Sequence, residues 1–416
     1  MKNKLTIYIL VAMVAGIAVG IGVNRGTNPA FVAAFAGNIK LLATIFIRLV
    51  QMIIAPLVFS TLVVGIAKLG NLSTVGRVGG KALLWFVTAS LCSLLIGLFF
   101  VNLLKPGVGV ALQDADAKSV EALVSQTKGF SFQTFIEHII PKSVFEAMAT
   151  NEILQLVIFS LFFGIASAAL GDKAKPVIKA LDSVSHIVLK MVGYVMSFAP
   201  FGVFGAIAGA FATQPVEKLL KVYANFFGSF LLGIAALWLL LILAGLVFLG
   251  PKKLKQLFRR LQNPLMVAFS TTSSEAVFPK LTEEMERFGC KEEIVAFILP
   301  LGYSFNLDGS MMYMTFASLF IAQAYGVDIS LGTQLTMLLV LMLTSKGVAG
   351  VPRASLIVVA ATCGMFHIPV EGVVVLILPI DHFCDMFRSA TNVVGNALAT
   401  AVVSKWEGEL GETKAH

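Results

Sequence analysis

The chain contains a series of apolar runs, each long enough to cross a lipid bilayer as a helix. A membrane-spanning helix needs about 20 predominantly apolar residues, and it satisfies its own backbone hydrogen bonds within the segment. We therefore predict an all-α polytopic membrane protein with seven or eight full spans. The runs that meet this requirement are Ile7 to Val23, Leu41 to Ala67, Leu83 to Leu104, Ile153 to Leu170, Ile187 to Ala212, Phe226 to Gly250 and Ile294 to Ala324.

Charge is scarce in this chain and follows a pattern. Only 13% of the residues are charged, whereas a typical soluble domain has about 25%. Basic residues accumulate in the cytoplasmic loops of membrane proteins. This pattern explains the net charge of +8 without nucleic acid, and it predicts cytoplasmic N- and C-termini in an inner or plasma membrane. The basic residues that follow the second, fourth and sixth runs are Lys68, Arg77, Lys81, Lys173, Lys175, Lys179, Lys252, Lys253, Lys255, Arg259 and Arg260.

Two segments in the C-terminal half interrupt the hydropathy pattern in the same way. The polar stretch Ser270 to Glu275 divides the apolar run from Met266 to Leu281. A second stretch, Thr344 to Pro352, divides the run from Leu335 to Ala361. Irregular backbone at membrane depth is tolerated only where protein buries it or a watery cavity solvates it. We therefore predict two re-entrant helical hairpins whose polar tips face a ligand or an ion, an arrangement known from secondary transporters.

A third interruption lies inside the run that begins at Ile294, where Pro300, Gly302 and Gly309 surround the segment Asn306 to Ser310. An amide, a carboxylate and opened backbone carbonyls are oxygen ligands that suit a small hard cation. Alternatively, Asp308 caps a broken helix end. The following run, Met311 to Met314, is expected to serve packing. Neither a bound metal nor an organic cofactor is expected. The residues of the candidate cation site are Ser90, Asn306, Asp308, Asn392 and Asn396.

A polar stripe occupies one face of the last apolar segment. Its members are Asp381, Asp385, Arg388, Asn392 and Asn396, and their spacings of four, three, four and four place them within an arc of about 80° on a helix. An ionisable group at the bilayer centre costs a few kcal/mol on insertion scales, so such a cluster normally faces a cavity or a partner. The stripe is therefore a candidate binding site. The alternative is an internal salt bridge between Asp385 and Arg388 without a ligand.

Four motifs together resemble the dicarboxylate/amino acid:cation symporters, which include glutamate transporters. They are Ser273-Ser274-Glu275, Asn306 to Ser310, Lys346 to Pro352 and Asp385 to Asn396. The resemblance covers nearly the whole chain. It implies eight spans and two re-entrant hairpins with inverted repeats, a homotrimer and an elevator-type motion. It also implies scaffold helices in residues 1–75, a transport-domain helix in 76–105, an extracellular loop and further scaffold helices in 106–215, and the main transport domain in 216–416.

The same resemblance assigns roles in substrate binding. Arg388 would pair with the side-chain carboxylate of the substrate, and Asp385 would receive the α-ammonium. Relatives that carry C4-dicarboxylates lack a carboxylate at the position of Asp385, because their substrates have no ammonium group. The resemblance thus favours glutamate or aspartate as substrate. The other candidate substrate-binding residues are Ser273, Ser274, Ser310, Gly350, Val351, Ser389 and Asn392.

Two departures from the family pattern concern the coupling ion. Sodium-coupled relatives have an Asp where this chain has Asn396 and a Thr where it has Ala89. The chain instead resembles proton-coupled bacterial members, and Glu275, Asp308 and Asp385 are the candidate proton acceptors, since burial raises the pKa of a carboxyl group. We predict proton-coupled import of acidic amino acids across the lipid bilayer. Sodium-coupled symport of acidic amino acids or C4-dicarboxylates is the alternative. Two other classes stay open, a passive channel and an intramembrane hydrolase that uses Asp308 with Asp385.

Arg353 is a further departure, because many relatives have a small residue at this place after Pro352. Relatives commonly carry a second arginine at positions that hold Thr272 and Met386 here. One hypothesis is that Arg353 supplies this charge and closes on the substrate or on Asp385. The other is that it faces solvent at the extracellular mouth.

Overall fold

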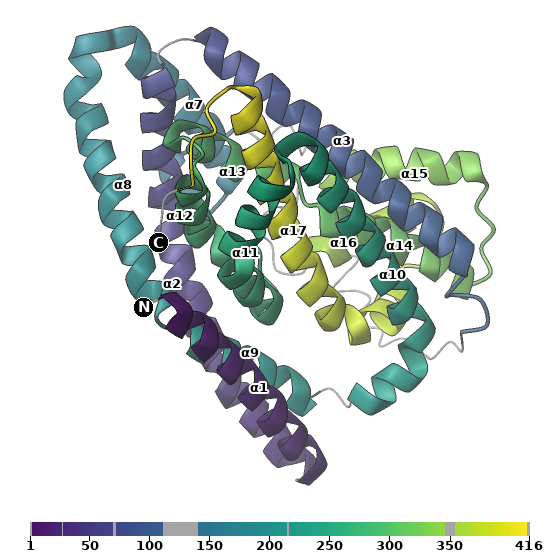
Figure 1. Ribbon diagram of the computed structural model, residues 1–416. Coiled ribbons are helices and arrows are strands. Elements are labelled where there is room, and N and C mark those ends of the chain that lie inside the picture. Colours follow the sequence, from purple (N-terminus) through teal and green to yellow (C-terminus); the bar gives the residue numbers. More distant parts are fainter. Residues whose placement is uncertain are drawn as a thin grey trace.

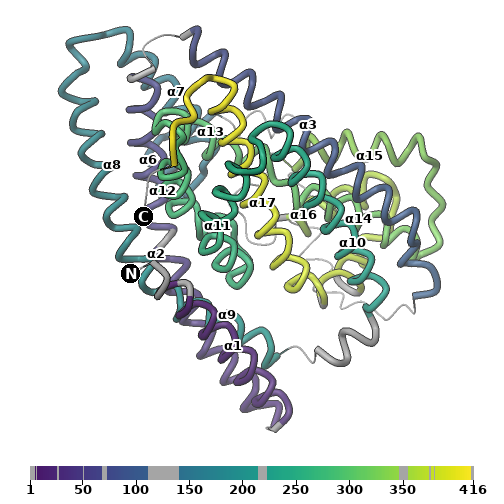
Figure 2. Tube along the Cα trace, in the orientation of Figure 1, coloured from purple at the N-terminus to yellow at the C-terminus, as the bar shows by residue number. Residues whose placement is uncertain are grey.

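The computed structural model describes residues 2–26, 28–69, 72–110, 140–213, 216–345 and 354–413. These residues fold into helices joined by short turns (Figure 1), and the order of the helices can be followed along the trace in Figure 2. The α-helices are α1 (Lys2–Gly26), α2 (Pro29–Leu69), α3 (Leu72–Leu104), α6 (Val144–Thr150), α7 (Ile153–Leu170), α8 (Lys175–Met196), α9 (Ala199–Thr213), α10 (Val216–Leu249), α11 (Pro251–Thr271), α12 (Phe278–Phe288), α13 (Glu292–Phe305), α14 (Asp308–Ala324), α15 (Leu331–Thr344), α16 (Ala354–Met365) and α17 (Leu378–Trp406). Short 3₁₀ turns occupy Gly171–Ala174 and Glu275–Val277, and Val373–Ile377 forms a π-helical turn before α17.

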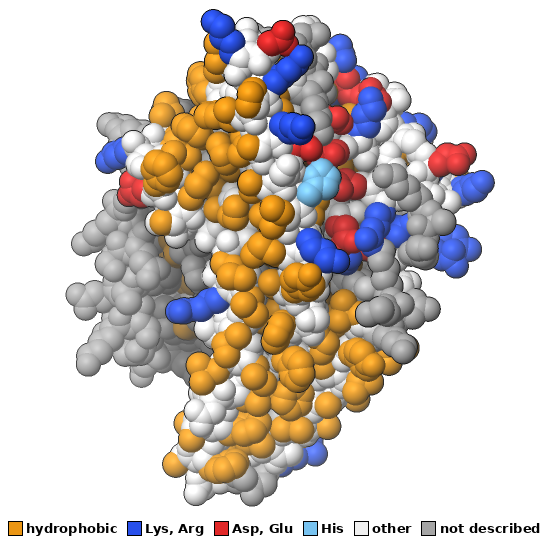
Figure 3. Space-filling model, turned by 90° about the vertical axis from the view of Figure 1, so that its left-hand side faces the viewer, with side chains coloured by type: hydrophobic (Ala, Val, Ile, Leu, Met, Phe, Trp, Pro, Cys, Tyr) orange, Lys and Arg blue, Asp and Glu red, His pale blue; other side chains and the backbone are white. Residues whose placement is uncertain are grey.

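Six segments of the described residues are long and apolar enough to cross a membrane: Ile7–Arg25, Pro29–Ala67, Ser73–Leu104, Ile153–Met196, Tyr223–Leu249 and Glu292–Ala324. Hydrophobic side chains cover much of the face that carries α8 (Figure 3), and the exposed ones on this helix include Val177, Val184, Ile187 and Tyr194. Lipid is the solvent that matches such a surface. The prediction of an all-α membrane protein is therefore supported by the fold.

One predicted span is wrong in its boundaries. The run from Ile187 to Ala212 is not a single helix, because α8 ends at Met196 and α9 begins at Ala199. The N–H groups of Ser197 and Phe198 turn back to carbonyls three residues earlier, and Pro200 has no N–H with which to continue the α8 ladder. Periodicity alone does not reveal this break, since both helices are equally apolar.

The basic segment after the sixth run is also not a loop, because it forms the first half of α11. Gly250 adopts a φ of 84°, and Pro251 follows at the first helical position, so the chain turns sharply from α10 into α11. Leu254, Leu257 and Leu261 are buried, whereas Lys255 and Arg259 between them are exposed. The first hairpin therefore begins 15 positions before the predicted start at Met266.

The first hairpin has the predicted helix–turn–helix form. α11 ends where Thr272 adopts a left-handed φ of 54°, and the chain returns through α12, which packs alongside α11. A buried ion pair joins the two arms, because Arg260 of α11 lies 3.4 Å from the carboxylate of Glu284 on α12. Lys280, one turn before Glu284 on α12, lies 3.1 Å from the same carboxylate. α15 and α16 pack against each other as the arms of the second hairpin, and residues 346–353 at its tip lie outside the described residues.

The helices pack in two groups. α1, α2, α7, α8 and α9 pack against one another, and α3, α10, α11, α13, α14 and α17 form the second group around α17. Figure 1 shows α1, α2, α8 and α9 on the left and α3, α10, α14 and α17 on the right. α13 packs on both groups because it contacts α2 and α17. The division of the sequence into scaffold and transport domains stays a prediction, since it concerns motion.

The end of α17 is fastened to the start of α3 by ion pairs. The carboxylate of Glu407 lies 2.8 Å from Arg77 and 2.6 Å from Lys81, and its side chain is only 4% exposed. The hydrogen bond from Arg77 lowers the pKa of the Glu407 carboxyl, and the weaker contribution of Lys81 acts in the same direction. Past this point the chain continues over the base of the first hairpin, where the N–H of Gly411 donates to the carbonyl of Gly289.

We expect Glu407→Gln to lower the free energy of unfolding by about 1 kcal/mol at pH 7, which is the usual size of a partly exposed ion pair. Because the folded pKa of Glu407 lies below the unfolded value of about 4.3, the stabilisation is present above that value and disappears as the pH falls through the folded pKa. Thermal unfolding in detergent at pH 7, 5 and 3 measures the difference. Glu409→Gln is the matched control, because its pair with Lys291 is exposed. A difference of the same size at pH 7, 5 and 3 would contradict the ionic explanation, because the stabilisation must decrease as the pH falls toward the folded pKa.

Candidate functional site

The polar stripe of α17 faces the break between α13 and α14. α17 packs against both of these helices as well as α3, α10 and α11. Asp381, Arg388, Asn392 and Asn396 are buried, and the side chain of Asp385 is 24% exposed. The prediction that these five side chains share one face is confirmed, and the structure brings them together with Ser90, Asn306, Asp308 and Ser310.

Arg388 is the centre of the charged part of the site. Its Nη2 lies 2.9 Å from Asp385 Oδ1 and 3.1 Å from Asp381 Oδ1. The guanidinium plane sits over the ring of Tyr313, 3.9 Å from the centroid, and the Tyr313 hydroxyl donates to Asp381 Oδ1 at 2.7 Å. The aromatic contact and the two carboxylates therefore fix the orientation of the guanidinium.

Two donors of this guanidinium are left over. Among the described residues, neither Nε nor Nη1 of Arg388 has a hydrogen-bond partner, although the residue is only 1% exposed. Leaving a buried donor unsatisfied costs about 1–3 kcal/mol, and more for a charged group. A ligand carboxylate would accept from these donors, because arginine pairs with carboxylates through two parallel N–H···O bonds. The geometry thus suits an anionic ligand.

Asn392 joins α17 to the start of α14. Its Oδ1 accepts from the N–H of Gly309 at 2.9 Å and from that of Ser310 at 3.3 Å, while its Nδ2 donates to Ser310 Oγ at 3.1 Å. The helices come this close because Gly309 has no side chain, since a Cβ there would lie 2.6 Å from the carbonyl oxygen of Arg388. Asn392 retains a second Nδ2 hydrogen, so a contact with substrate is compatible with its packing role.

The carboxylate of Asp308 lies at the start of α14 and is fully buried. It accepts hydrogen bonds from Asn306 Nδ2 at 3.2 Å and from Ser93 Oγ at 3.4 Å. Ser90 Oγ donates to the carbonyl of Phe305 at 3.2 Å, and the Oδ1 atom of Asn306 has no partner among the described residues. Oxygen atoms therefore gather at the break in the helix, as predicted from the sequence.

Asn396 occupies the backbone carbonyls at the same break. With its amide oriented so that both groups meet suitable partners, Nδ2 donates to the carbonyls of Gly302 at 3.2 Å and Asn306 at 3.3 Å. A carboxylate at this position could not donate these bonds. The amide thus takes two oxygen atoms that a cation would otherwise use.

The tip of the first hairpin lies against α13. The Tyr303 hydroxyl donates to the carbonyl of Ser274 at 3.0 Å, and Ser273 Oγ accepts from the N–H of Ala276 at 3.2 Å. Ser273, Ser274 and Glu275 are all half-buried. The roles predicted for them stay predictions, as does that of the buried Ser389. Three other candidates, Gly350, Val351 and Arg353, lie outside the described residues.

Tyr313 is the functional candidate that the sequence did not reveal. It lies in the run Met311 to Met314, which was expected to serve packing, and it is fully buried. Besides packing, Tyr313 contacts Arg388 and Asp381 and thereby holds two charged residues of the stripe in position. The one signal available was a hydroxyl-bearing aromatic residue one turn and a half after Asp308. Such a hydroxyl usually has a hydrogen-bond partner when buried.

Comparison with known proteins identifies the family. A model of the Sodium:dicarboxylate symporter family matches residues 5–406. The chain belongs to this family. The proton/sodium-glutamate symport protein of Bacillus caldotenax is 38% identical over 99% of this chain and 97% of its own length. The C4-dicarboxylate transport protein of Bacillus subtilis (strain 168) is 39% identical over 99% of this chain and 96% of its own length. That of Cupriavidus pinatubonensis is 43% identical over 88% of this chain and 85% of its own length.

The family assignment decides the class of function. Members of the sodium:dicarboxylate symporter family are membrane transporters, and this chain is therefore a symporter and not an enzyme. The alternative of an intramembrane hydrolase is wrong. In the site, Asp385 lies 2.9 Å from the guanidinium of Arg388, whereas Asp308 accepts hydrogen bonds from Asn306 and Ser93. The relatives carry glutamate in some cases and C4-dicarboxylates in others, at similar identities to this chain.

Proposed function

We propose that this symporter imports glutamate or aspartate together with protons. The observation that carries the proposal is the position of Asp385, 2.9 Å from Arg388 and the most exposed member of the stripe. Asp381, Asp385 and Arg388 together carry one net negative charge. A dicarboxylate would add two negative charges to this cluster, whereas an acidic amino acid adds an ammonium group that Asp385 can neutralise. Juxtaposed like charges cost several kcal/mol in a buried site, so the cluster favours the amino acid.

The substrate would enter with its side-chain carboxylate directed to Nε and Nη1 of Arg388. Its ammonium would then lie beside Asp385, since the two residues are one helical turn apart on α17. Asn392 and the hairpin tip at Ser273 and Ser274 would hold the α-carboxylate, and Ser310, which accepts from Asn392 Nδ2, would contact the distal carboxylate. Tyr313 and Asp381 keep the guanidinium in place during this exchange of partners.

The state of the cation-binding region supports protons as the coupling ion. Asn396 occupies the carbonyls of Gly302 and Asn306 with an uncharged amide, which weakens a sodium site at the helix break. Glu275, Asp308 and Asp385 remain the candidates to carry the proton. A C4-dicarboxylate is the second candidate substrate, because relatives named as C4-dicarboxylate transport proteins reach 43% identity.

We further propose that the transporter works as a homotrimer with an elevator motion and cytoplasmic termini. The two groups of helices support this proposal, because α17 and the substrate site lie in one group while α8 exposes an apolar face from the other. The C-terminal segment bonds the base of the first hairpin, so that hairpin would move with α17 as one body.

Uptake into proteoliposomes tests the function. We impose a proton gradient with an acidic external buffer and an alkaline vesicle lumen. In choline buffer without sodium, we then expect uphill accumulation of labelled glutamate or aspartate. A protonophore should abolish it. Uptake that stopped without sodium would refute proton coupling, and uptake of succinate with no uptake of either amino acid would refute the substrate. Gradient-independent leak would refute symport.

A further inference from the structure

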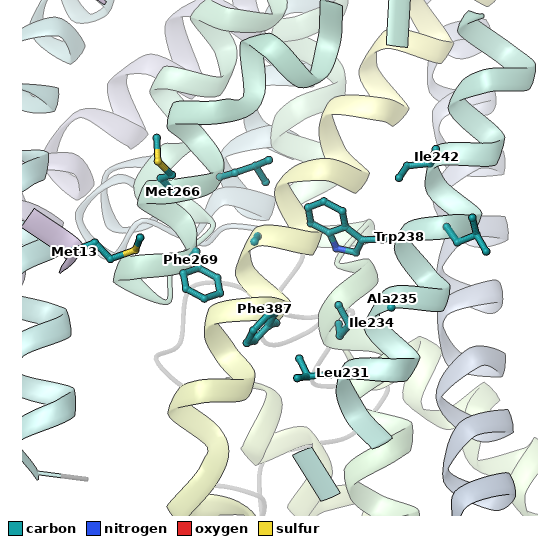
Figure 4. A pocket seen from close by; sticks show the side chains of 12 residues that line it. Met13, Leu231, Ile234, Ala235, Trp238, Ile242, Met266, Phe269 and Phe387 are labelled. Atoms are coloured by element: carbon teal, nitrogen blue, oxygen red, sulfur yellow. The ribbon is translucent and has the colours of Figure 1, made fainter. Parts of the chain in front are cut away.

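A groove of about 720 Å³ lies between α10, α11 and α17, behind the substrate site. Its wall is apolar, and Figure 4 shows Trp238, Phe269 and Phe387 directed into it from these three helices. Met13 of α1 closes the side toward the other group of helices. Ile234, Leu265 and Met266 also line the groove.

The walls of the groove are held by specific contacts. Trp238 Nε1 donates to Thr391 Oγ1 at 2.8 Å, which fixes the indole against α17. The rings of Phe269 and Phe387 meet edge to face with centroids 5.0 Å apart. The indole therefore presents its apolar body to the groove, while its polar atom is satisfied within the protein. Only an apolar ligand suits such a wall.

One face of α11 continues from this groove into a row of exposed polar residues. Lys252, Lys255, Arg259 and Gln262 are exposed, and Met266 and Phe269 follow them at the same spacings of three and four. On an ideal helix these six positions fall within about 100°, so they share one face. Among the described residues, no carboxylate forms an ion pair with any of the three cations in this row. Cationic and apolar chemistry thus meet end to end on α11.

The spacing matches the depth profile of a lipid leaflet. Met266 lies seven positions after Arg259, which corresponds to a rise of about 10 Å along the helix. The interfacial zone on each side of a bilayer is about 5–8 Å thick, and lysine and arginine side chains extend toward it. When the groove lies in the hydrocarbon, Lys255 and Arg259 therefore lie at the depth of the phosphates. The positive-inside rule places this end of α11 in the cytoplasmic leaflet.

We propose that the groove binds one anionic phospholipid, with an acyl chain along Trp238, Met266 and Phe269 and its phosphate on Lys255 and Arg259. A free anion would use the cations but not the groove, and a neutral lipid would fill the groove without the charges. The lipid would touch Met13 of α1 and Phe387 of α17 at once. Phe387 immediately precedes Arg388, so the lipid supports the back of the substrate site.

Quenching of Trp238 fluorescence by brominated acyl chains tests this site directly. The chain has three tryptophans, and Trp85→Phe with Trp406→Phe leaves Trp238 as the reporter. Trp85 loses no hydrogen bond in the exchange, because its Nε1 has no partner among the described residues. We expect brominated phosphatidylglycerol to quench at much lower mole fraction than brominated phosphatidylcholine. Each cation should contribute about fivefold, or about 25-fold together.

Charge and shape variants separate the parts of the site. Lys255→Gln with Arg259→Gln should bring the two lipids to similar quenching curves, whereas the control pair Lys173→Gln and Lys179→Gln, also exposed and basic, should keep the preference. Ala235→Phe, which fills the groove, should weaken quenching by both lipids. Equal quenching by the two lipids in the reporter protein would overturn the proposal. So would a preference that survives loss of Lys255 and Arg259, or one lost equally in the control pair.

Discussion

Asp385→Asn is expected to abolish the uptake of glutamate and aspartate while leaving or increasing the uptake of succinate. The substitution keeps the shape of the side chain but removes the charge that would neutralise the substrate ammonium. Losing one partner of a buried charge pair costs about 2–5 kcal/mol, or roughly 30- to 5,000-fold in affinity. For a dicarboxylate the effect of the substitution on affinity has the opposite sign. The cluster of Asp381, Arg388 and residue 385 changes from one net negative charge to neutral, so it repels the dicarboxylate less.

Uptake rates in proteoliposomes measure this change in selectivity. Labelled glutamate and labelled succinate are each offered to the wild type and to Asp385→Asn, and the ratio of the two uptake rates is compared. Asp328→Asn is the matched control, since Asp328 is exposed between α14 and α15. Asp381→Asn should lower the uptake of both substrates, because Asp381 holds Tyr313 and Arg388. Unchanged glutamate uptake in Asp385→Asn would remove the basis for an amino acid substrate.

The shared face of the polar stripe on α17 was predictable because it depends only on the period of one helix. Five polar residues at intervals of three and four must share a face, whatever surrounds them. Their partners were not predictable in the same way. Tyr313 lies 68 positions before Asp381 in the chain, and their contact depends on how α14 packs against α17. This packing depends on the close approach of α17 to α14 at Gly309. The presence of a glycine in a helix does not identify the helix that packs against it.

The helix boundaries show the same limit. The break at Asn306 was visible because proline, glycine and polar residues coincide there. The break between α8 and α9 was not, since the sequence stays apolar on both sides of Ser197. The first half of α11 was misread as a basic loop because its charges dominate the composition. Its leucines recur at helical intervals, and packing of that face decides the structure.

Asn396→Asp is expected to give the transporter a dependence on sodium. An ionised aspartate cannot donate to the carbonyls of Gly302 and Asn306, so both oxygens become available. They would join the new carboxylate and the unpartnered Oδ1 of Asn306, and this set of oxygen atoms suits a small hard cation. Without a cation, the added charge would lie buried near Asp308, which disfavours the site. We expect sodium to stimulate uptake by about tenfold or more, equivalent to at least ~1.4 kcal/mol of added binding.

Uptake of labelled substrate at increasing sodium concentrations, with choline keeping the ionic strength constant, measures this effect. Asn102→Asp is the matched control, because it makes the same substitution on α3, where Asn102 Nδ2 also donates to a backbone carbonyl, that of Leu98. Sodium should leave the control unaffected, since the side-chain partner of Asn102 among the described residues is the uncharged amide of Gln334 at 2.6 Å. If Asn396→Asp folds, binds substrate and yet ignores sodium, the amide of Asn396 does not determine the coupling ion. The coupling ion would then depend on Ala89 or on the second hairpin.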